Sequence, residues 1–361
     1  MLKSLFRSPA AKRRFRAMPK VPWWRIGLAR RRKSVSDWGV NVTTRKKGAT
    51  TQTGVIVFSI MRNEHHFLPF FLDHYRELGV GEFHIFADRC DPQTIDFLFS
   101  QPDVTILESE RAFGEVFGKK FNGYPRRLPS LLKEKLTDEL FLGRWVLVVD
   151  ADEFLILPPP LKQINALTDR LERSGQYFSY APLVDFYPPR LAIRNYDPGF
   201  SPFRFNEYFD TGPYHRWDGK VTPFKFHRGF RSRLMKMMAE RFPGELKAIY
   251  GTHPISPPND YKFPLIKQGA GLMRGGSHNV IGVKPSSRYS TSLAHFKLHP
   301  GLDEKIENAL REKQYYQGSL EYEFLKLAID KTADDSLVFE GSRRFTGAQS
   351  LVDADLLQEL D

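Results

Sequence analysis

The sequence has a single cysteine, Cys90, which excludes an internal disulfide framework and any zinc or iron–sulfur site that needs several thiolates. No stretch reaches the run of about 18 apolar residues that a membrane-spanning helix needs. Residues 1–16 also lack the uninterrupted apolar stretch of a secretory signal. These absences predict a cytoplasmic protein that does not cross a membrane.

Acidic residues are almost absent from residues 1–47, which hold 15 lysines and arginines against one acid, Asp37. The rest of the chain holds 39 basic and 41 acidic side chains, so the net charge of +12 comes from its beginning. A nearly neutral remainder lacks the cationic surface that binds many phosphates, and we expect no nucleic-acid partner. Because Trp23, Trp24 and other apolar residues separate the charges, this segment is interpreted as a flexible tail or as a peripheral contact with the anionic inner face of the cell membrane.

Hydrophobic residues make up 41% of the 361 residues, and phenylalanine alone occurs 30 times, which is enough for a large buried core. From residue 55 onward, short apolar runs alternate with helical stretches, and this alternation predicts parallel strands connected by helices. The expected strands are 55–60, 82–88, 104–107 and 145–150, and the expected helices are 67–80, 95–99 and 129–142.

The second half of the chain is richer in proline, glycine and aromatic residues. Residues 160–300 are expected to form substrate-specific loops, with a strand at 177–184. Helices are expected again at 301–316 and 321–330. The final residues, 331–361, have the composition of a polar tail whose removal would be tolerated.

The apolar strand that ends at Asp150 opens directly into acidic residues. Asp150 and Asp152 are separated by one residue, and Glu153 adds a third acid. Ligands of open α/β sheets bind at such strand ends, and a divalent cation relieves the repulsion between the carboxylates. Oxygen ligands of this kind favour Mg²⁺ or Mn²⁺, which bridges to substrate phosphates. The alternative interpretation is an acidic turn that binds no metal.

Three motifs in the first half resemble one family of enzymes. They are SIMRNE at 59–64, FADRCDPQT at 86–94 and VVDADEF at 148–154. In this order they resemble the nucleotide-binding half of bacterial family 2-type glycosyltransferases of the GT-A fold. Later blocks, among them GGSHNV at 275–280 and AHFKLH at 294–299, extend the resemblance over roughly residues 54–325.

The resemblance implies an α/β fold of the GT-A type, in which helices flank a mainly parallel, Rossmann-like sheet and further helices follow. It places a catalytic domain at 54–330 after the basic segment 1–53, with the nucleotide-sugar half at 54–157, the acceptor half at 158–300 and helices at 301–330. The implied reaction is an inverting transfer of sugar from a nucleotide-diphosphate donor, such as a UDP-sugar, to a hydroxyl group. A glycan or lipid-linked acceptor, in the synthesis of cell-surface polysaccharide or glycolipid, is implied as the partner.

The resemblance also assigns residues to the donor. Arg62, Asn63 and Glu64 in the first motif would border the nucleotide, and Asp88 in the second would contact its base. Relatives usually carry D-N-x-S-x-D where this chain has D-R-C-D at 88–91, so the contacts to the base or ribose differ here.

The metal site implied by the resemblance divides the work between the two aspartates. Asp150 would lie toward the ribose or the metal shell, whereas Asp152 would bind the Mn²⁺ or Mg²⁺ ion directly. A later histidine completes the coordination in similar enzymes. His278 is the first candidate for this ligand and His295 the second, with a structural histidine as the alternative in each case.

Sugar transfer needs cations for the diphosphate and a base for the acceptor proton. Asp185 and Asp210 are the candidates for the base, and Asp218 is a third, although each carboxylate could equally cap a turn. The candidates for diphosphate binding, which could also be ordinary surface charges, are Lys262, Lys297, Arg231 and Arg233.

Two other functions use similar residues. A nucleotidyltransferase or phosphotransferase also needs paired carboxylates and metal, but the chain has no G-x-x-x-x-G-K-[ST] phosphate loop. The second alternative is a non-catalytic, nucleotide-binding protein that is held at a membrane by its basic segment.

Overall fold

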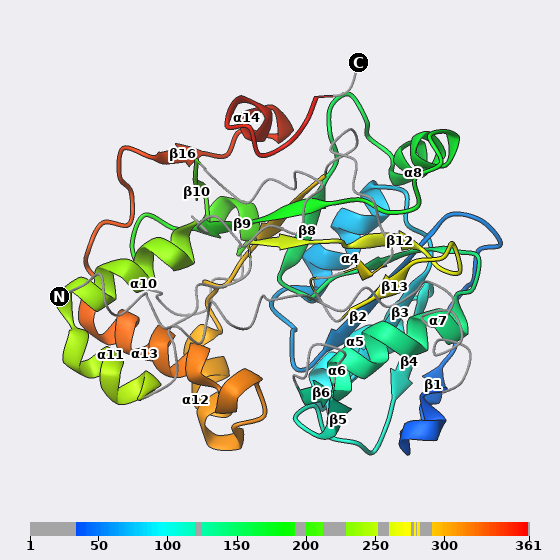
Figure 1. Cartoon of the computed structure of the whole chain (residues 1–361), viewed down its shortest axis with the longest axis horizontal. Coiled ribbons are helices and arrows are strands. Elements are labelled where there is room, and N and C mark those ends of the chain that lie inside the picture. The colour runs from blue at the N-terminus through cyan, green and yellow to red at the C-terminus, as the bar shows by residue number, and fades with distance from the viewer. Residues whose placement is uncertain are drawn as a thin grey trace.

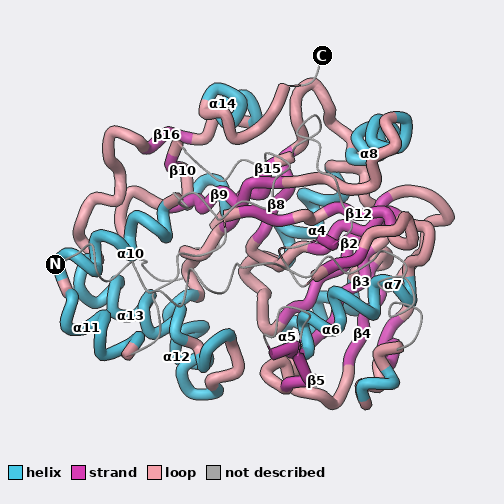
Figure 2. Tube along the Cα trace, in the orientation of Figure 1, coloured by secondary structure: helices cyan, strands magenta, loops and turns pink. Residues whose placement is uncertain are grey.

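The structure is a computed structural model with a mixed α/β architecture, in which strands lie between groups of helices (Figures 1 and 2). It describes residues 34–119, 125–191, 200–211, 229–251, 260–275, 278, 280–281 and 291–359. The strands are β1 Thr43–Lys46, β2 Val55–Met61, β3 Phe83–Ala87, β4 Val104–Glu108, β5 Val116–Lys119, β6 Pro125–Arg127, β7 Trp145–Val148, β8 Glu153–Ile156, β9 Ala181–Tyr187, β10 Tyr208–Asp210, β11 Tyr261–Lys262, β12 Leu265–Lys267, β13 Met273–Arg274, β14 Val280–Ile281, β15 Ser292–His295 and β16 Ser342–Arg344. The helices are α4 Leu68–Glu77, α5 Pro92–Ser100, α6 Leu128–Leu131, α7 Thr137–Leu140, α8 Ile164–Arg173, α9 Pro202–Phe205, α10 Phe230–Arg241, α11 Pro243–Tyr250, α12 Leu302–Glu312, α13 Leu320–Thr332 and α14 Ala348–Asp353, with short helical turns η1 Ser36–Trp38, η2 Leu132–Leu136 and η4 Tyr316–Gly318.

The first sheet has the strand order β1-β4-β3-β2-β7-β12. Its central strands β4, β3, β2 and β7 are parallel, and the edge strands β1 and β12 are antiparallel to their neighbours. The four strands expected between residues 55 and 150 are therefore confirmed, with the helices expected at 67–80 and 95–99. The first strand of the parallel series, β2, lies inside the sheet, and the strand order reverses beside it. This half therefore has the topology of a Rossmann-like sheet.

Both faces of this sheet are buried because alternate residues of β2 enter different cores. Val55 and Val57 belong to the core that contains α4, α5 and α8, whereas Ile56 and Phe58 pack with α6, η2 and Phe141. A strand with helices on both faces needs apolar side chains at nearly every position, and Ser59 is the one polar residue in the run VIVFSI.

The chain crosses from the first sheet to the second between β7 and β8. The second sheet has the order β16-β10-β9-β15-β8, and β11 also pairs with β9. β8 is antiparallel to β15, which in turn is parallel to β9. Since β7 ends at Val148 and β8 begins at Glu153, Asp150 and Asp152 lie at the junction of the two sheets.

Helices α10, α11, α12 and α13 form a separate group on the left of Figure 1 and share a second hydrophobic core. This core reaches the second sheet through Tyr187 of β9, whose ring stacks on Phe230 of α10 with centroids 4.6 Å apart. The helices expected at 301–316 and 321–330 are confirmed as α12 and α13.

Two expected elements differ from the structure. The run at 177–184 contributes only its end to β9, since Phe178 and Tyr180 pack instead against Tyr261 and Phe263 in a small aromatic core. The helix expected at 129–142 is interrupted by the π-helical turn η2. In this turn the backbone hydrogen bonds join residues i and i+5, and not i and i+4 as in an α-helix.

The folded region begins before residue 54, where the sequence predicted the end of a basic segment. Val35 and Val40 are buried in the core with α6, and β1 pairs with β4 along the edge of the first sheet. Residues 1–33, which carry most of the predicted membrane contact, lie outside the described residues.

The end of the chain is also folded, which corrects the interpretation of 331–361 as a polar tail. Strand β16 pairs with β10, and Leu351, Leu356 and Leu357 are buried in the main hydrophobic core. The polar residues between these leucines gave the segment the composition of a tail, whereas the few apolar ones attach it to the fold.

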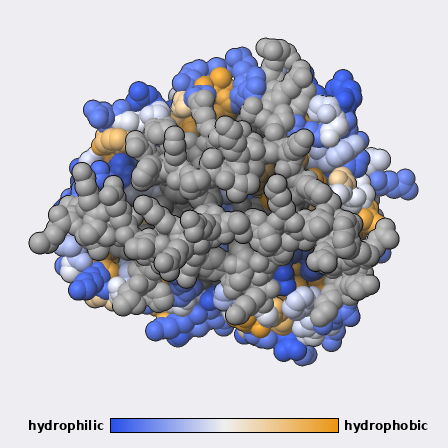
Figure 3. All heavy atoms as spheres, in the orientation of Figure 1, coloured by the Kyte–Doolittle hydropathy of each residue, from blue (hydrophilic) through white to orange (hydrophobic). Residues whose placement is uncertain are grey.

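The described surface that Figure 3 displays mixes hydrophilic residues with small hydrophobic patches, and none of these visible patches is broad. Every described helix is too short or too polar to cross a lipid bilayer.

Substitution of Leu351 tests whether the end of the chain stabilises the protein. We expect Leu351→Ala to lower the free energy of unfolding by roughly 2–5 kcal/mol, because the side chain is fully buried and its loss leaves a cavity. The exposed neighbour Gln349 provides the control, and Gln349→Ala is expected to change stability by less than about 0.5 kcal/mol. Urea denaturation measures both, and equal stability of the two variants would restore the tail interpretation.

Candidate active site

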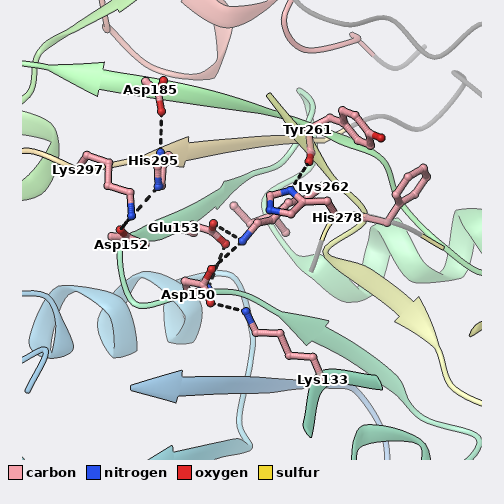
Figure 4. A network of polar contacts seen from close by, with 12 residues as sticks. Lys133, Asp150, Asp152, Glu153, Asp185, Tyr261, Lys262, His278, His295 and Lys297 are labelled. Atoms are coloured by element: carbon pink, nitrogen blue, oxygen red, sulfur yellow. Dashed lines mark hydrogen bonds and ion pairs between the residues drawn. The ribbon is translucent and has the colours of Figure 1, made fainter. Parts of the chain in front are cut away.

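The acidic turn between the sheets is fixed by its own backbone. Glu153 N–H donates to the Asp150 carbonyl at 3.1 Å, and Asp150 N–H donates to Glu153 Oε2 at 3.0 Å. The amide of Phe296, just after β15, donates to the Asp152 carbonyl at 2.9 Å. These bonds turn the chain sharply at the end of β7, so that Asp150 and Glu153 face Lys262 and Asp152 faces the other way, toward Lys297 and His295 (Figure 4).

Asp150 lies between two buried lysines. Lys133 from η2 donates to Oδ1 at 2.5 Å, and Lys262 from β11 donates to Oδ2 at 2.8 Å and also contacts Glu153. Burial alone would raise the pKa of Asp150, but the two ammonium groups outweigh it and hold this pKa well below its ordinary value. Burial likewise opposes the charge of Lys262, but Asp150 and Glu153 outweigh it and raise the pKa of Lys262 to about 12.

Asp152 faces the second sheet. Its Oδ2 lies 3.1 Å from Lys297 Nζ and 3.6 Å from His295 Nε2. Burial works against ionisation here too, but Lys297 and His295 more than compensate and lower the pKa of Asp152. Asp152, Glu153 and His295 are all buried, and their ligand atoms lie within 4.8 Å of one another, so they form a group that could hold a metal ion.

His295 is held on its other side by Asp185. Nδ1 of His295 lies 2.7 Å from Asp185 Oδ1. Asp185 also accepts from Arg231 Nε at 2.8 Å, and Arg231 reaches Glu321 of α13 at 3.2 Å. Burial opposes the charge of Asp185, but Arg231 and His295 outweigh it and lower the pKa to about 2.

These contacts revise the predicted metal ligands. The convergent donor group contains Glu153 in place of Asp150, whose two oxygens accept from Lys133 and Lys262. His278, the first histidine candidate, lies beside β11 with Nδ1 2.9 Å from the Tyr261 carbonyl, and burial together with Lys262 lowers its pKa to about 3 (Figure 4). The second candidate, His295, is the histidine that joins the acids.

The loop after β2 and the end of β3 meet at a second buried carboxylate. Asp88 is 1% exposed, and neither of its oxygens accepts a hydrogen bond from a described residue. The nearest cation is Arg62, whose Nη1 lies 3.9 Å from Asp88 Oδ2 and 2.8 Å from Glu312 of α12. Burial raises the pKa of Asp88, and Arg62 offsets this only in part.

The other two residues predicted at the nucleotide have protein partners. Asn63 has φ of 52° and accepts the amide of Asp91, so it shapes the turn that leads to α5. Glu64 pairs with Lys305 of α12 at 2.6 Å. Helix α12 therefore lies against the loop that follows β2.

Asp210 ends β10, which pairs with β9. Its oxygens accept from Arg233 at 3.0 and 3.1 Å and from the hydroxyl of Tyr187 at 2.5 Å. The two bonds from Arg233 attach α10 to the second sheet, and the bond from Tyr187 joins β9 to β10. Asp218, the third candidate base, lies outside the described residues.

The four candidates for diphosphate binding fall into two pairs with different partners. Lys262 and Lys297 reach the acidic turn, whereas Arg231 and Arg233 bind Asp185 and Asp210 respectively.

Lys133 was not predicted from the sequence. It occupies the middle of a run, LLKEKL, whose charged residues are typical of a solvated helix face. The π-helical turn instead directs Lys133 inward, where its side chain is only 5% exposed. A pattern of helical period does not reveal such a local change of geometry.

The sequence matches no family profile and shows no significant similarity to a curated protein. Among solved structures, it is similar to a protein from Bacillus anthracis that is provisionally assigned as a glucose-1-phosphate thymidylyltransferase and was crystallised with sucrose. The identity is 8%, the match covers 76% of this chain and 83% of the other, and the TM-score is 0.26. A likeness this weak carries no argument about function, and the resemblance to family 2-type glycosyltransferases stays a prediction.

A double-mutant cycle tests the buried ion pair in the site. Lys262 and Glu153 are 4% and 2% exposed in their side chains, so removing Lys262 leaves Glu153 as a buried charge without its lysine counterion. We expect Lys262→Met and Glu153→Gln to be coupled by roughly 0.5–3 kcal/mol in urea denaturation. The exposed pair Lys326 and Asp330, at 56% and 54%, serves as the control and should show at most about 0.5 kcal/mol. Equal coupling in both pairs would contradict this description of the site.

Proposed function

We propose that the protein is a metal-dependent glycosyltransferase that transfers a sugar from a nucleotide-diphosphate donor, such as a UDP-sugar, to a hydroxyl acceptor. The observation that carries this proposal is the group Asp152, Glu153 and His295 at the junction of the two sheets, next to the carboxyl end of a central parallel strand. Open α/β sheets bind their ligands at such ends.

The residues of this group fit a divalent cation. Two carboxylates and one imidazole form the mixed oxygen and nitrogen donor set that suits Mn²⁺, and Mg²⁺ accepts the carboxylates. His295 is hydrogen-bonded to Asp185 through Nδ1, which leaves Nε2 toward Asp152. A bound ion would neutralise charge on the departing diphosphate.

The charges around the group support joint binding of metal and diphosphate. Asp150, Asp152, Glu153 and Asp185 have the cationic partners Lys133, Lys297, Lys262 and Arg231, and Arg231 also pairs with Glu321. A divalent ion would still add an excess of positive charge in this buried site. The diphosphate of a donor supplies the balancing negative charge, and Lys262 and Lys297 are placed to reach it.

Asp88 supports a nucleotide at the adjacent strand. A buried carboxylate that accepts no hydrogen bond from the described residues destabilises the fold unless a ligand donates to it. The donors of a nucleobase or a ribose would satisfy it. Arg62, which lies between Asp88 and Glu312, is then the nearest cation to the same ligand.

The acceptor base is the part of the predicted mechanism that the contacts disfavour. Asp185 is bound by Arg231 and has a pKa of about 2, so it is a weak base. Asp210 is saturated by Arg233 and Tyr187. Neither residue is proposed as the base. A glycan or lipid-linked acceptor, and a peripheral membrane contact through residues 1–47, remain proposals from the sequence.

Metal binding is the first test of this function. We expect isothermal titration calorimetry to detect Mn²⁺ binding, and UDP to tighten it by roughly 10-fold because the two charges compensate. Asp152→Asn should weaken Mn²⁺ by at least about 100-fold, since loss of an outer partner alone typically costs 10- to 100-fold. Asp210→Asn is the control, because Asp210 is bound by Arg233 and not by the donor group.

Released UDP from a panel of UDP-sugars with Mn²⁺ then measures turnover. Formation of a nucleotide-sugar from a nucleoside triphosphate and a sugar phosphate would favour the nucleotidyltransferase instead. Binding of nucleotide without turnover of either kind would favour the non-catalytic alternative.

Substitution of Asp88 is expected to change thermal stability and UDP affinity in opposite directions. We expect Asp88→Asn to raise the midpoint of thermal unfolding, because it removes a buried charge, and to weaken UDP by roughly 10-fold, because a charged acceptor is lost. The exposed Asp96→Asn, on the neighbouring helix α5, should change neither quantity. A stabilised variant with unchanged UDP affinity would place the nucleotide elsewhere.

A further inference from the structure

We propose that Asp185 is a positioning residue, which fixes the ring of His295 so that Nε2 is presented to a divalent metal at Asp152 and Glu153. This inference rests on the proposed function, because it takes the same group as a metal site. It gives Asp185 a role different from that of the acceptor base expected from the sequence.

The register of the second sheet places Asp185, His295 and Glu153 side by side. His295 of β15 is the register partner of Asp185 on β9 and of Glu153 on β8. Register partners on adjacent strands project from the same face of a sheet. Three neighbouring strands therefore align an acid, a histidine and a second acid in one row, and no flexible loop is needed to bring them together (Figure 4).

The hydrogen bond between Asp185 and His295 sets the chemistry of the ring. An ionised carboxylate can only accept, so at 2.7 Å the proton of the neutral imidazole lies on Nδ1. The lone pair is then on Nε2, which is 3.6 Å from Asp152 Oδ2. Metal-binding histidines commonly donate their second ring N–H to a carboxylate, which fixes the tautomer and increases the basicity of the ligand nitrogen.

Asp185 is itself held by Arg231 of α10, which is not part of the candidate metal group. Its Oδ2 accepts the amide of Arg231 at 3.3 Å and its Oδ1 accepts Arg231 Nε at 2.8 Å, both from the first turn of α10. Arg231 continues to Glu321 of α13. The orientation of His295 is thus coupled to the helices that cover the second sheet.

The chain provides a matched control for this arrangement. Asp210 is buried to the same degree as Asp185 and binds Arg233, two residues after Arg231 on the same helix. Each aspartate joins α10 to the sheet, but of these two aspartates only Asp185 contacts His295. A purely structural role predicts similar consequences for loss of either carboxylate, whereas a positioning role predicts a difference.

The experiment compares the Mn²⁺ affinities of the wild-type protein, Asp185→Asn and Asp210→Asn by isothermal titration calorimetry, with their thermal unfolding midpoints. We expect both variants to lose stability, and Asp185→Asn alone to bind Mn²⁺ roughly 10- to 100-fold more weakly. An Mn²⁺ affinity of Asp185→Asn equal to that of wild type, or equal losses in both variants, would overturn the inference while leaving the metal site intact. Absence of Mn²⁺ binding by the wild-type protein would overturn the proposed function and this inference with it.

A second measurement needs no variant at position 185, in case Asp185→Asn does not fold. Long-range ¹H–¹⁵N spectra of the wild-type imidazoles, with His295→Gln to assign the signal, report which nitrogen carries the proton. We expect His295 to be protonated on Nδ1, with the Nε2 signal broadening when Mn²⁺ is added, because the ion is paramagnetic. An Nε2-protonated ring, or an Nε2 signal that does not respond to the ion, would contradict the proposal.

Discussion

The candidate site depends on the neutralisation of carboxylates that the fold buries at the junction of its two sheets. A buried charge is costly unless a counterion and hydrogen bonds accompany it. Asp152 and Asp185 have such partners, and so does Asp150, whose side chain is 38% exposed. The partners come from elements far apart in the sequence: η2, β11, the segment after β15, and α10. The folding of both halves is therefore tied to the same small network.

This constraint explains the arrangement of the outer helices. The π-helical turn η2 directs Lys133 toward Asp150, and α10 brings Arg231 and Arg233 to two aspartates of the second sheet. Helix α12 contributes differently, since Glu312 and Lys305 bind residues of the loop after β2. Residues of η2 and α10 thus contact acids of the two sheets, and residues of α12 contact the loop after β2.

Two kinds of buried acid coexist in the first half. The acids of the β7–β8 turn are compensated by the protein, whereas Asp88, at the end of β3, accepts no hydrogen bond from the described residues. Compensation offsets the cost of burying an acid, whereas an uncompensated acid destabilises the fold and is ready to accept a donor from a ligand. The contrast separates the residues that maintain the site from one that is suited to recognition.

The sequence by itself determined the parallel strands of the first sheet, because an apolar run such as that ending at Val148 has few alternatives to a buried strand. It also located the acids at the end of that strand, since the change from apolar to acidic residues is local. Only the tertiary structure decided which partner each acid has. Sequence spacing did not distinguish His278 from His295, because their difference lies in strand register, and it did not reveal Lys133, because a π-helical turn changes the direction of one side chain. Electrostatic pairing in a protein interior acts over a few ångströms in space, whatever the separation along the chain.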